Sequence, residues 1–139
     1  MLVKEVMTHP VITIECSNTV LNACNMYRDC RIGCLVVTCS NGSIGLITER
    51  DLIERTICDK RDPEKTKVKD IMTVDIITIH ALAKIEKALD IMIKNNIKKL
   101  PVVMKGDIVG MITVTDISRA RPDLSKRFID TWVRPEWHD

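Results

Sequence analysis

The chain of 139 residues carries 21 basic and 19 acidic side chains, and its net charge is +2. This balance excludes a surface built to attract nucleic acid or an anionic membrane. Hydrophobic residues make up 45% of the chain, yet it holds one Phe, one Tyr and two Trp, so we expect an aliphatic core. No apolar run approaches the ~18 residues of a membrane-spanning helix, and no signal peptide is visible. We therefore expect a soluble, cytoplasmic protein.

The most prominent feature of the sequence is an internal repeat. Residues 3–51 align with residues 68–116 without a gap, and 15 of the 49 aligned positions are identical. The strongest matches lie at the two ends of the repeat, where 3–8 aligns with 68–73 and 45–51 with 110–116. Two copies of one small unit predict a pseudo-twofold pair with equivalent clefts between the copies, where ligands can bind.

In chain order, the first copy predicts a strand, a helix, a two-stranded hairpin and a last helix. The strand is expected over 11–14, and the helix has apolar residues at helical spacing after a cap at Ser17 or Asn18. The hairpin joins the apolar runs 35–37 and 44–47 through Ser40-Asn41-Gly42, and the last helix begins at Thr48. The apolar positions of the first helix are Val20, Ala23, Cys24 and Tyr27.

The second copy repeats this order. A strand is expected over 76–79, and the helix after it ends at Asn95-Asn96, which suits a left-handed stop. The runs 100–103 and 108–112 flank the turn Lys105-Gly106-Asp107, and the last helix begins at Thr113. The apolar positions of its first helix are Ile85, Ala88, Leu89 and Met92.

These elements divide the chain into four parts. The charged segment around Pro63 is a linker, and Pro122 ends the second copy. An extra helix is expected over 123–133, because Leu124, Phe128 and Trp132 recur at four-residue spacing. The predicted parts are repeat 1 at 1–58, the linker at 59–67, repeat 2 at 68–120 and a helical tail at 121–139.

All six cysteines lie in the first half of the chain, at positions 16, 24, 30, 34, 39 and 58. The spacing Cys30-x3-Cys34-x4-Cys39 could hold zinc with a fourth ligand, but no Cys-x-x-Cys pair and no nearby His cluster accompany it. Cysteine also serves as a small buried apolar residue. We favour that interpretation, with six free thiols in a reducing compartment and no metal site.

The sharpest local motif is Gly-x-x-Thr-x-x-Asp at 45–51 and again at 110–116. At a junction between strand and helix, Thr-x-x-Asp resembles a capping box, in which Thr covers a backbone N–H and the acid reaches back to the cap. The same geometry offers a carboxylate that can accept hydrogen bonds from two adjacent hydroxyls, beside a helix start that favours phosphate. Capping and ligand binding are compatible, and composition and spacing leave both open.

Six motif blocks in the right order, covering residues 3–120, resemble a tandem pair of CBS (cystathionine-β-synthase) domains. These blocks include Val-x-Asp/Glu-hydrophobic-Met-Thr at each start, Ile-x-x-Leu-Pro-Val-Val at 97–103, and the Gly-to-Asp motif at each end. The resemblance implies an α+β fold of two β-α-β-β-α repeats related by pseudo-twofold symmetry and packed through their sheets, plus the C-terminal helix. It also implies a regulatory module without catalysis, which needs no cofactor and binds adenine nucleotides or S-adenosyl compounds between the copies.

Carried over position by position, the resemblance implies a set of nucleotide-binding residues. Asp51 and Asp116 would bind ribose hydroxyls, and backbone groups of Thr8 and Thr73 would read the base edge. The adenine would lie among Val11, Ile32 and Met111 in one cleft and among Ile76, Ile97 and Leu46 in the other. Beside the ribose or phosphate would lie Thr48, Thr113, Thr115 and Arg50, and facing the phosphates Lys98 and Lys99, with Gly33 at the corresponding place in copy one.

Four classes of function remain to be compared. The leading hypothesis is a ligand-sensing homodimer that acts in trans on a separate protein, because only about 19 residues follow the second copy. An enzyme is disfavoured, since His9, His80 and His138 are scattered and no Ser-His-acid or Cys-His set is evident. A nucleic-acid binder is disfavoured by charge and by the missing aromatic platform. A structural dimerisation module with empty clefts stays open, because a fold can outlast its ligand.

Overall fold

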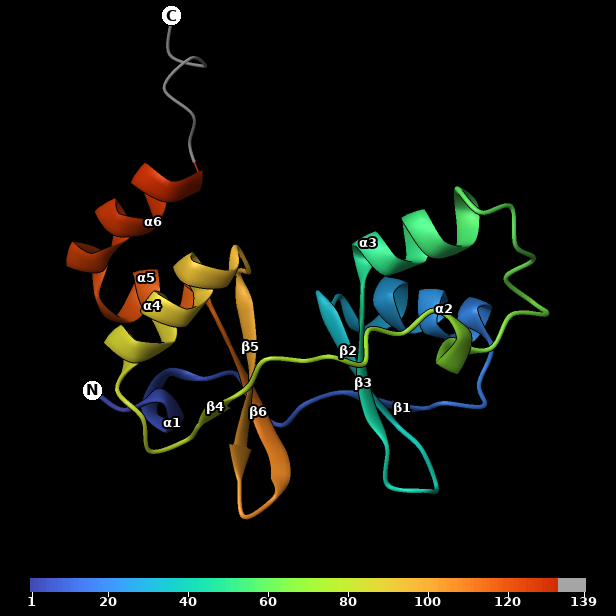
Figure 1. Cartoon of the computed structure of the whole chain (residues 1–139), viewed down its shortest axis with the longest axis horizontal. Helices are drawn as coiled ribbons and strands as arrows, with labels where there is room; N and C mark the ends of the chain where they lie inside the picture. Colours follow the sequence, from blue (N-terminus) through green and yellow to red (C-terminus); the bar gives the residue numbers. More distant parts are fainter. Residues whose placement is uncertain (133–139) are drawn as a thin grey trace, which may run out of the picture. The chain divides into compact units, whose positions relative to one another are not determined.

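The computed structural model describes residues 1–132, and these form two compact units (Figure 1). One unit, here called the terminal unit, combines Met1–Val11 with the chain from Ile77 onward. The other, here called the middle unit, is Ile12–Ile76. Each unit is built around its own three-stranded sheet and is described by itself.

The middle unit follows the order strand, helix, hairpin, helix. Its sheet has the order β1-β2-β3, with β1 parallel to β2 and β2 antiparallel to β3. A short 3-10 helix, η2, closes the unit. The elements are β1 (Thr13–Glu15), α2 (Val20–Cys30), β2 (Cys34–Thr38), β3 (Ile44–Thr48), α3 (Glu49–Leu52), the π-helix η1 (Ile53–Ile57) and η2 (Val68–Asp70).

The terminal unit repeats this order, with α1 as the counterpart of η2, and adds η3 and α6 at the C-terminal end. Its sheet has the order β4-β5-β6, again with one parallel and one antiparallel pair. A register shift between Val102 and Val103 interrupts the β5–β6 pairing. The elements are α1 (Val3–Val6), β4 (Ile79–His80), α4 (Ile85–Asn95), β5 (Lys99–Met104), β6 (Asp107–Thr113), α5 (Val114–Ala120), the 3-10 helix η3 (Pro122–Leu124) and α6 (Ser125–Trp132).

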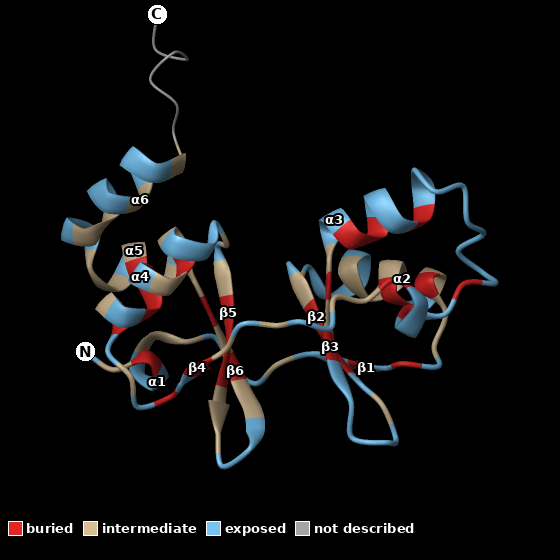
Figure 2. Cartoon of the chain, viewed as in Figure 1, coloured by how far each residue is buried: buried red, intermediate tan, exposed pale blue. Residues whose placement is uncertain are grey.

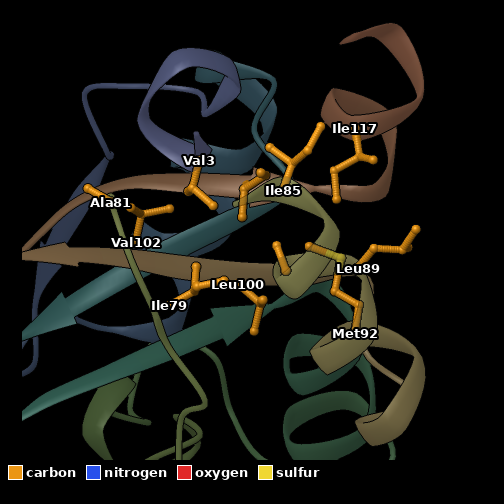
Figure 3. Close-up of a cluster of buried hydrophobic side chains, with 11 residues drawn as sticks. Val3, Ile79, Ala81, Ile85, Leu89, Met92, Leu100, Val102 and Ile117 are labelled. Carbon is orange, nitrogen blue, oxygen red and sulfur yellow. The ribbon is translucent and has the colours of Figure 1, made fainter. Parts of the chain in front are cut away.

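Each unit has an aliphatic core between its sheet and its helices (Figure 2). In the terminal unit, Val3 from the start of the chain packs in one cluster with residues of the sheet and of α4 and α5 (Figure 3). Its fully buried members include Ile85, Leu89, Leu100 and Ile117. Aliphatic side chains therefore supply both cores, as the composition predicts.

The first residues of each sequence repeat complete the unit that holds the other repeat. The N–H of Val3 donates to the carbonyl of Ala83 at 2.8 Å, which anchors the start of the chain in the terminal unit. Leu46 and Thr73 exchange both backbone hydrogen bonds, at 2.9 and 2.8 Å, which anchors the start of the second repeat in the middle unit. The compact units therefore do not follow the sequence repeats, and the predicted boundaries at 58, 67 and 120 remain predictions about the sequence.

Most of the elements expected from the sequence are present within a few residues of their predicted ends. The order β-α-β-β-α is confirmed in both units, and Asn96 ends α4 in the left-handed conformation with φ 53°. The cap of α2 was predicted wrongly, because Thr19, not Ser17 or Asn18, accepts the hydrogen bond from the N–H of Asn22.

The C-terminal helix is confirmed, with two differences from the sequence prediction. Residues 122–124 form a 3-10 turn before α6 begins at Ser125, because Pro122 occupies its first turn, where a missing N–H is tolerated. Val133 at the predicted end lies outside the described residues, as does Trp137.

The prediction of six free thiols is wrong. Cys16 and Cys39 form a disulfide, and their Cα atoms are 5.2 Å apart. Cys16 follows β1 and Cys39 follows β2, so the parallel pairing of these strands brings the two residues together. Cys24, Cys30, Cys34 and Cys58 lie outside this disulfide, and of these Cys30 and Cys58 are exposed and are not core residues.

Residues 1–132 contain neither a membrane-spanning helix nor a cluster of metal-ligating side chains. Across residues 1–132, no helix combines the length and apolar character that crossing a bilayer requires. In the same residues, no cluster of His, Cys, Asp and Glu side chains has an arrangement suited to a metal ion.

Gly45 and Gly110 are expected to be intolerant of any side chain. A Cβ at Gly45 would lie 2.7 Å from Met72 Sδ and 3.0 Å from the carbonyl oxygen of Thr73. Because the carbonyl belongs to a paired backbone, it cannot move aside as a flexible side chain can. We predict that Gly45→Ala lowers the free energy of unfolding by about 1–3 kcal/mol, measured by urea denaturation.

The exposed Ser43→Ala on the same hairpin is the matched control and should leave the midpoint unchanged. Gly110→Ala tests the terminal unit, since its Cβ would lie 3.0 Å from the carbonyl oxygen of Thr8. An unfolding midpoint of Gly45→Ala equal to that of the control would contradict the close approach.

Candidate functional site

Each unit places an aspartate at the start of the helix that follows its hairpin. In the middle unit, Asp51 Oδ2 accepts from the N–H of Thr48 at 3.0 Å, and Thr48 Oγ1 accepts from the N–H of Asp51 at 3.3 Å. In the terminal unit, Asp116 and Thr113 make the same pair of bonds at 3.0 and 3.1 Å. Both motifs are therefore capping boxes, as the first interpretation of the sequence predicts.

A second threonine reaches each aspartate from the segment that enters the unit. Thr73 Oγ1 lies 3.3 and 3.2 Å from the two carboxylate oxygens of Asp51. Thr8 Oγ1 lies 3.3 and 3.5 Å from those of Asp116. Each carboxylate is thus held between two threonines. One is the cap threonine of its helix, Thr48 or Thr113, and the other is here called the incoming threonine, Thr73 or Thr8. The sequence motifs contain all four threonines, but not their meeting at one acid.

The backbone of the incoming threonines is already paired. Thr8 donates its N–H to the carbonyl of Met111 at 2.8 Å and accepts from the N–H of Met111 at 2.9 Å. Thr73 makes the same exchange with Leu46. Only the second lone pair of each carbonyl oxygen is left for another donor. The predicted role of these groups in reading a base edge remains a prediction that rests on that lone pair.

The two aspartates differ in their surroundings. Asp51 is only 7% exposed, whereas Asp116 is half-buried. Arg55 Nε lies 3.7 Å from Asp51 Oδ1, and its Nη1 donates to the carbonyls of Ile71 and Met72. Ala120 occupies the matching position after Asp116, so no cation stands there. The spacing of four residues between Asp51 and Arg55 was visible in the sequence but was not used.

Tyr27 forms a hydrogen bond to the end of β3, next to the capping box of Thr48 and Asp51. Its hydroxyl donates to the carbonyl of Ile47 at 2.5 Å, one residue before the cap Thr48. Burial raises the pKa of the Tyr27 phenol well above its usual value, and the nearby Cys34, Glu49 and Asp51 raise that pKa further. The sequence marks Tyr27 as an apolar helix position and gives no sign of this hydrogen bond.

The C-terminal helix α6 contacts one of the predicted phosphate-facing lysines. Lys98 Nζ lies 5.8 Å from the ring centroid of Trp132, within reach of a cation–π interaction. The indole N–H of Trp132 donates to Asn96 Oδ1 at 2.6 Å, and Arg127 forms an ion pair with Asp90. Helix α6 therefore packs on α4 and on the loop that carries Lys98, inside the terminal unit.

Each predicted site residue belongs to one of the two units. Arg50 is exposed and lies 3.9 Å from Glu54. Thr115 lines a cavity of about 240 Å³ between α5 and α6, together with Arg119 and Phe128. The terminal unit holds Thr8, Val11, Ile97, Lys98, Lys99, Met111, Thr113, Thr115 and Asp116, and the middle unit Ile32, Gly33, Leu46, Thr48, Arg50, Asp51, Thr73 and Ile76. Both predicted adenine sets draw on the two units, and these sets stay predictions.

A tandem pair of β-α-β-β-α units, each with a threonine-bound aspartate, defines the class of protein. The family model for the CBS domain matches the chain twice, at residues 3–57 and 68–123. The chain therefore belongs to the CBS domain family, and the resemblance recognised in the sequence is confirmed.

Relatives and solved structures support this assignment. An uncharacterised protein of Methanopyrus kandleri is 31% identical over 124 residues, which cover 88% of this chain but only 63% of that protein. A CBS domain protein of unknown function from Thermoplasma acidophilum superposes with a TM-score of 0.82 at 25% identity, covering 96% of this chain and 78% of that one. A CBS domain pair in complex with 5'-methylthioadenosine and S-adenosyl-L-methionine has a TM-score of 0.76 at 28% identity, covering 88% and 97%.

The raised pKa of the Tyr27 phenol predicts how the stability of the fold changes at alkaline pH. Because its pKa is raised in the folded state, its contribution to stability is complete below the unfolded pKa of about 10 and is lost as the pH rises toward the folded pKa. Tyr27 is the only tyrosine, so tyrosinate absorbance reports it alone. We expect tyrosinate to form only together with loss of the circular dichroism signal.

Tyr27→Phe provides the companion measurement. It should lower the free energy of unfolding by about 0.5–1.5 kcal/mol at neutral pH, the net value of one hydrogen bond. It should also reduce the fall of that free energy as the pH rises above about 10. Ionisation of Tyr27 near its ordinary pKa in a fully folded chain would contradict the buried environment.

Proposed function

We propose that this chain is a regulatory module that binds adenosine-containing ligands, AMP, ADP, ATP or S-adenosyl compounds, and has no catalytic activity of its own. The observation that carries the proposal is the duplicated carboxylate, Asp51 and Asp116, each set between two threonines. The related CBS domain pair that was crystallised with two adenosine derivatives supports the choice of ligand class.

The carboxylates retain capacity for a ribose. An ionised carboxylate has about four acceptor sites on its two oxygens. At Asp116, the N–H of Thr113 and the hydroxyl of Thr8 use two of them. The remaining sites suit the two adjacent hydroxyls of a ribose, which would form charge-assisted hydrogen bonds. The half-buried position of Asp116 favours such bonds, because partial exclusion of water strengthens them.

The site in the middle unit is more restricted. Asp51 is nearly covered, and Arg55 approaches one of its oxygens. A ribose at Asp51 must therefore compete with the side chain of Arg55, whereas Ala120 occupies the matching position after Asp116. We expect Asp116 to be the stronger of the two ribose sites. Lys98, which lies on the surface near Trp132, would then supply a positive charge for the phosphates of a nucleotide in the terminal unit.

We further propose that the module acts in the cytoplasm, as a homodimer, on a separate protein. Apolar side chains are available for such contacts: Ile53 and Ile57, one helical turn apart in η1, are 52% and 71% exposed. Exposed apolar residues grouped on one face are typical of protein–protein contacts. The alternative is a structural dimerisation module without a ligand, which the same surface would also suit.

Replacing each aspartate by asparagine tests the ligand-binding role. Asparagine keeps an oxygen for the capping N–H but loses the charge and the second acceptor. We expect Asp116→Asn to weaken nucleotide binding at its own site at least tenfold, a loss of about 1.4 kcal/mol. Asp51→Asn should weaken the other site. Isothermal titration with AMP, ADP, ATP, S-adenosylmethionine and NAD measures both.

Asp107→Asn and Asp29→Asn are the matched controls, because each removes an exposed charge from the same unit as the tested aspartate without touching a carboxylate site. Both should bind as the wild type does. If no adenine compound binds the wild type below about millimolar, where the free energy is only some −4 kcal/mol, the proposal fails and the structural module takes its place.

The homodimer is tested by light scattering at micromolar concentration, where we expect twice the monomer mass. The double variant Ile53→Ser, Ile57→Ser should shift the mass toward the monomer, since it removes exposed apolar area that a second copy would cover. The control Val74→Ser changes another exposed apolar residue outside η1. A monomer mass for the wild type would refute the dimer.

A further inference from the structure

The disulfide joins two neighbouring parallel strands at the same end. Glu15 of β1 pairs with Thr38 of β2, and the next residues are Cys16 and Cys39. The N–H of Cys16 donates to the carbonyl of Thr38 at 2.9 Å, which continues the ladder up to the bridge. The Cα separation of 5.2 Å lies within the usual range for a disulfide, so the sheet itself brings the sulfurs together.

The residue exposures favour attack on one end of the bridge. Cys16 is only 9% exposed, whereas Cys39 lies half-buried at the start of the hairpin turn. Of the two residues, Cys39 is therefore the more accessible to an incoming thiolate. Two other cysteines, Cys30 and Cys58, keep exposed thiols. Exposed thiols are typical of reducing compartments, in which a disulfide is usually transient or redox-sensing.

The bridged loop also holds the segment that reaches the aspartate. The carbonyl of Cys16 accepts from the N–H of Lys69 at 3.1 Å, and the carbonyl of Asn18 accepts from the N–H of Val68 at 2.8 Å. These bonds dock η2, and four residues later Thr73 donates to Asp51. The bridge is thus separated from the incoming threonine by one short helical segment.

The terminal unit supplies an internal control for this arrangement. The N–H of Lys4 donates to the carbonyl of Ala81 at 2.9 Å, and the N–H of Val3 donates to that of Ala83, which are the same two bonds at the matching positions. Ala81 and Met104 stand where the middle unit has Cys16 and Cys39. The docking of the incoming segment is therefore common to both units, and the sulfur bridge is confined to one.

We infer that Cys16–Cys39 is a reversible dithiol–disulfide site, whose oxidation state controls how firmly residues 68–73 are held in the middle unit. In reduction, one thiolate of a dithiol reductant attacks Cys39 Sγ, the S–S bond breaks, and Cys16 leaves as a thiolate and takes up a proton. The second thiol of the reductant, as a thiolate, then attacks the reductant sulfur of the mixed disulfide, and Cys39 leaves as a thiolate and takes up a proton. The protein gains two electrons and two protons, and the reductant becomes a disulfide. This inference does not depend on the proposed nucleotide role.

Hydrogen exchange of the full chain, without nucleotide, tests the inference. The protein is compared in its oxidised form, after reduction with dithiothreitol, and after reoxidation with oxidised glutathione. We expect the amides of Val68 and Lys69 to exchange at least tenfold faster in the reduced form and to recover on reoxidation. The matching amides of Val3 and Lys4 should not change, because no bridge supports them.

Variants separate the bridge from general effects of reduction. Cys16→Ala with Cys39→Met installs the residues that the terminal unit carries at the same positions, and it should exchange as the reduced protein does in all three conditions. Cys30→Ser with Cys58→Ser removes two exposed thiols and should respond as the wild type does.

Three results would overturn the inference. One is alkylation of both Cys16 and Cys39 in protein that has never met a reductant. Another is failure of the bridge to re-form after reduction. The third is equal exchange at Val68 and Lys69 in the oxidised and reduced forms. None of these results depends on whether an adenosine ligand binds.

Discussion

The structure depends on an exchange of short backbone segments between the sequence repeats. Thr8 pairs with Met111 and Thr73 with Leu46, each through two backbone hydrogen bonds. Gly110 and Gly45 leave room for this pairing, because a Cβ there would lie 3.0 Å from the carbonyl oxygen of the incoming threonine. Once the threonine is in place, its hydroxyl reaches the aspartate that caps the next helix. The close approach of the incoming threonine to the glycine therefore links the edge of the sheet, the start of the helix and the candidate site.

The two copies share this frame but differ around it. The middle unit adds an ion pair from Arg55 and a disulfide, and it covers Asp51 almost completely. At the corresponding places the terminal unit has Ala120, Ala81 and Met104, and it adds α6, which contacts Lys98. The additions do not alter the capping boxes, whose distances agree within a few tenths of an ångström. These differences between the copies thus leave the capping geometry of each carboxylate unchanged.

The sequence predicts what depends on local chemistry. Helical spacing places α2 and α4, Thr-x-x-Asp places the caps, and turn residues place the hairpins, because each is determined within a few neighbouring residues. Thr19 was missed because Ser17 and Asn18 are equally good caps by type, and the choice depends on backbone angles at the end of β1.

The remaining features involve residues far apart in the sequence. Cys16 and Cys39 meet only through the register of two parallel strands, which cysteine spacing does not report. Trp132 meets Asn96 and Lys98 only because α6 folds back on α4. The same is true of Thr8 and Asp116, which are 108 positions apart. The motif blocks therefore identify the residues of the candidate site without the contacts that assemble it.

The capping role and the ligand role of the aspartates support each other. A carboxylate held by a backbone N–H and a threonine hydroxyl loses its rotamer freedom when the unit folds. A ligand that later uses its free lone pairs does not have to order it again, and preorganisation of this kind raises affinity without a new contact. The cap is therefore no evidence against a ribose site. At Asp51, the ion pair with Arg55 has the opposite effect on affinity, because a ligand must first displace an interaction that folding has already formed. On the proposed function, the position of Arg55, rather than the presence of the motif, distinguishes the two copies of the carboxylate.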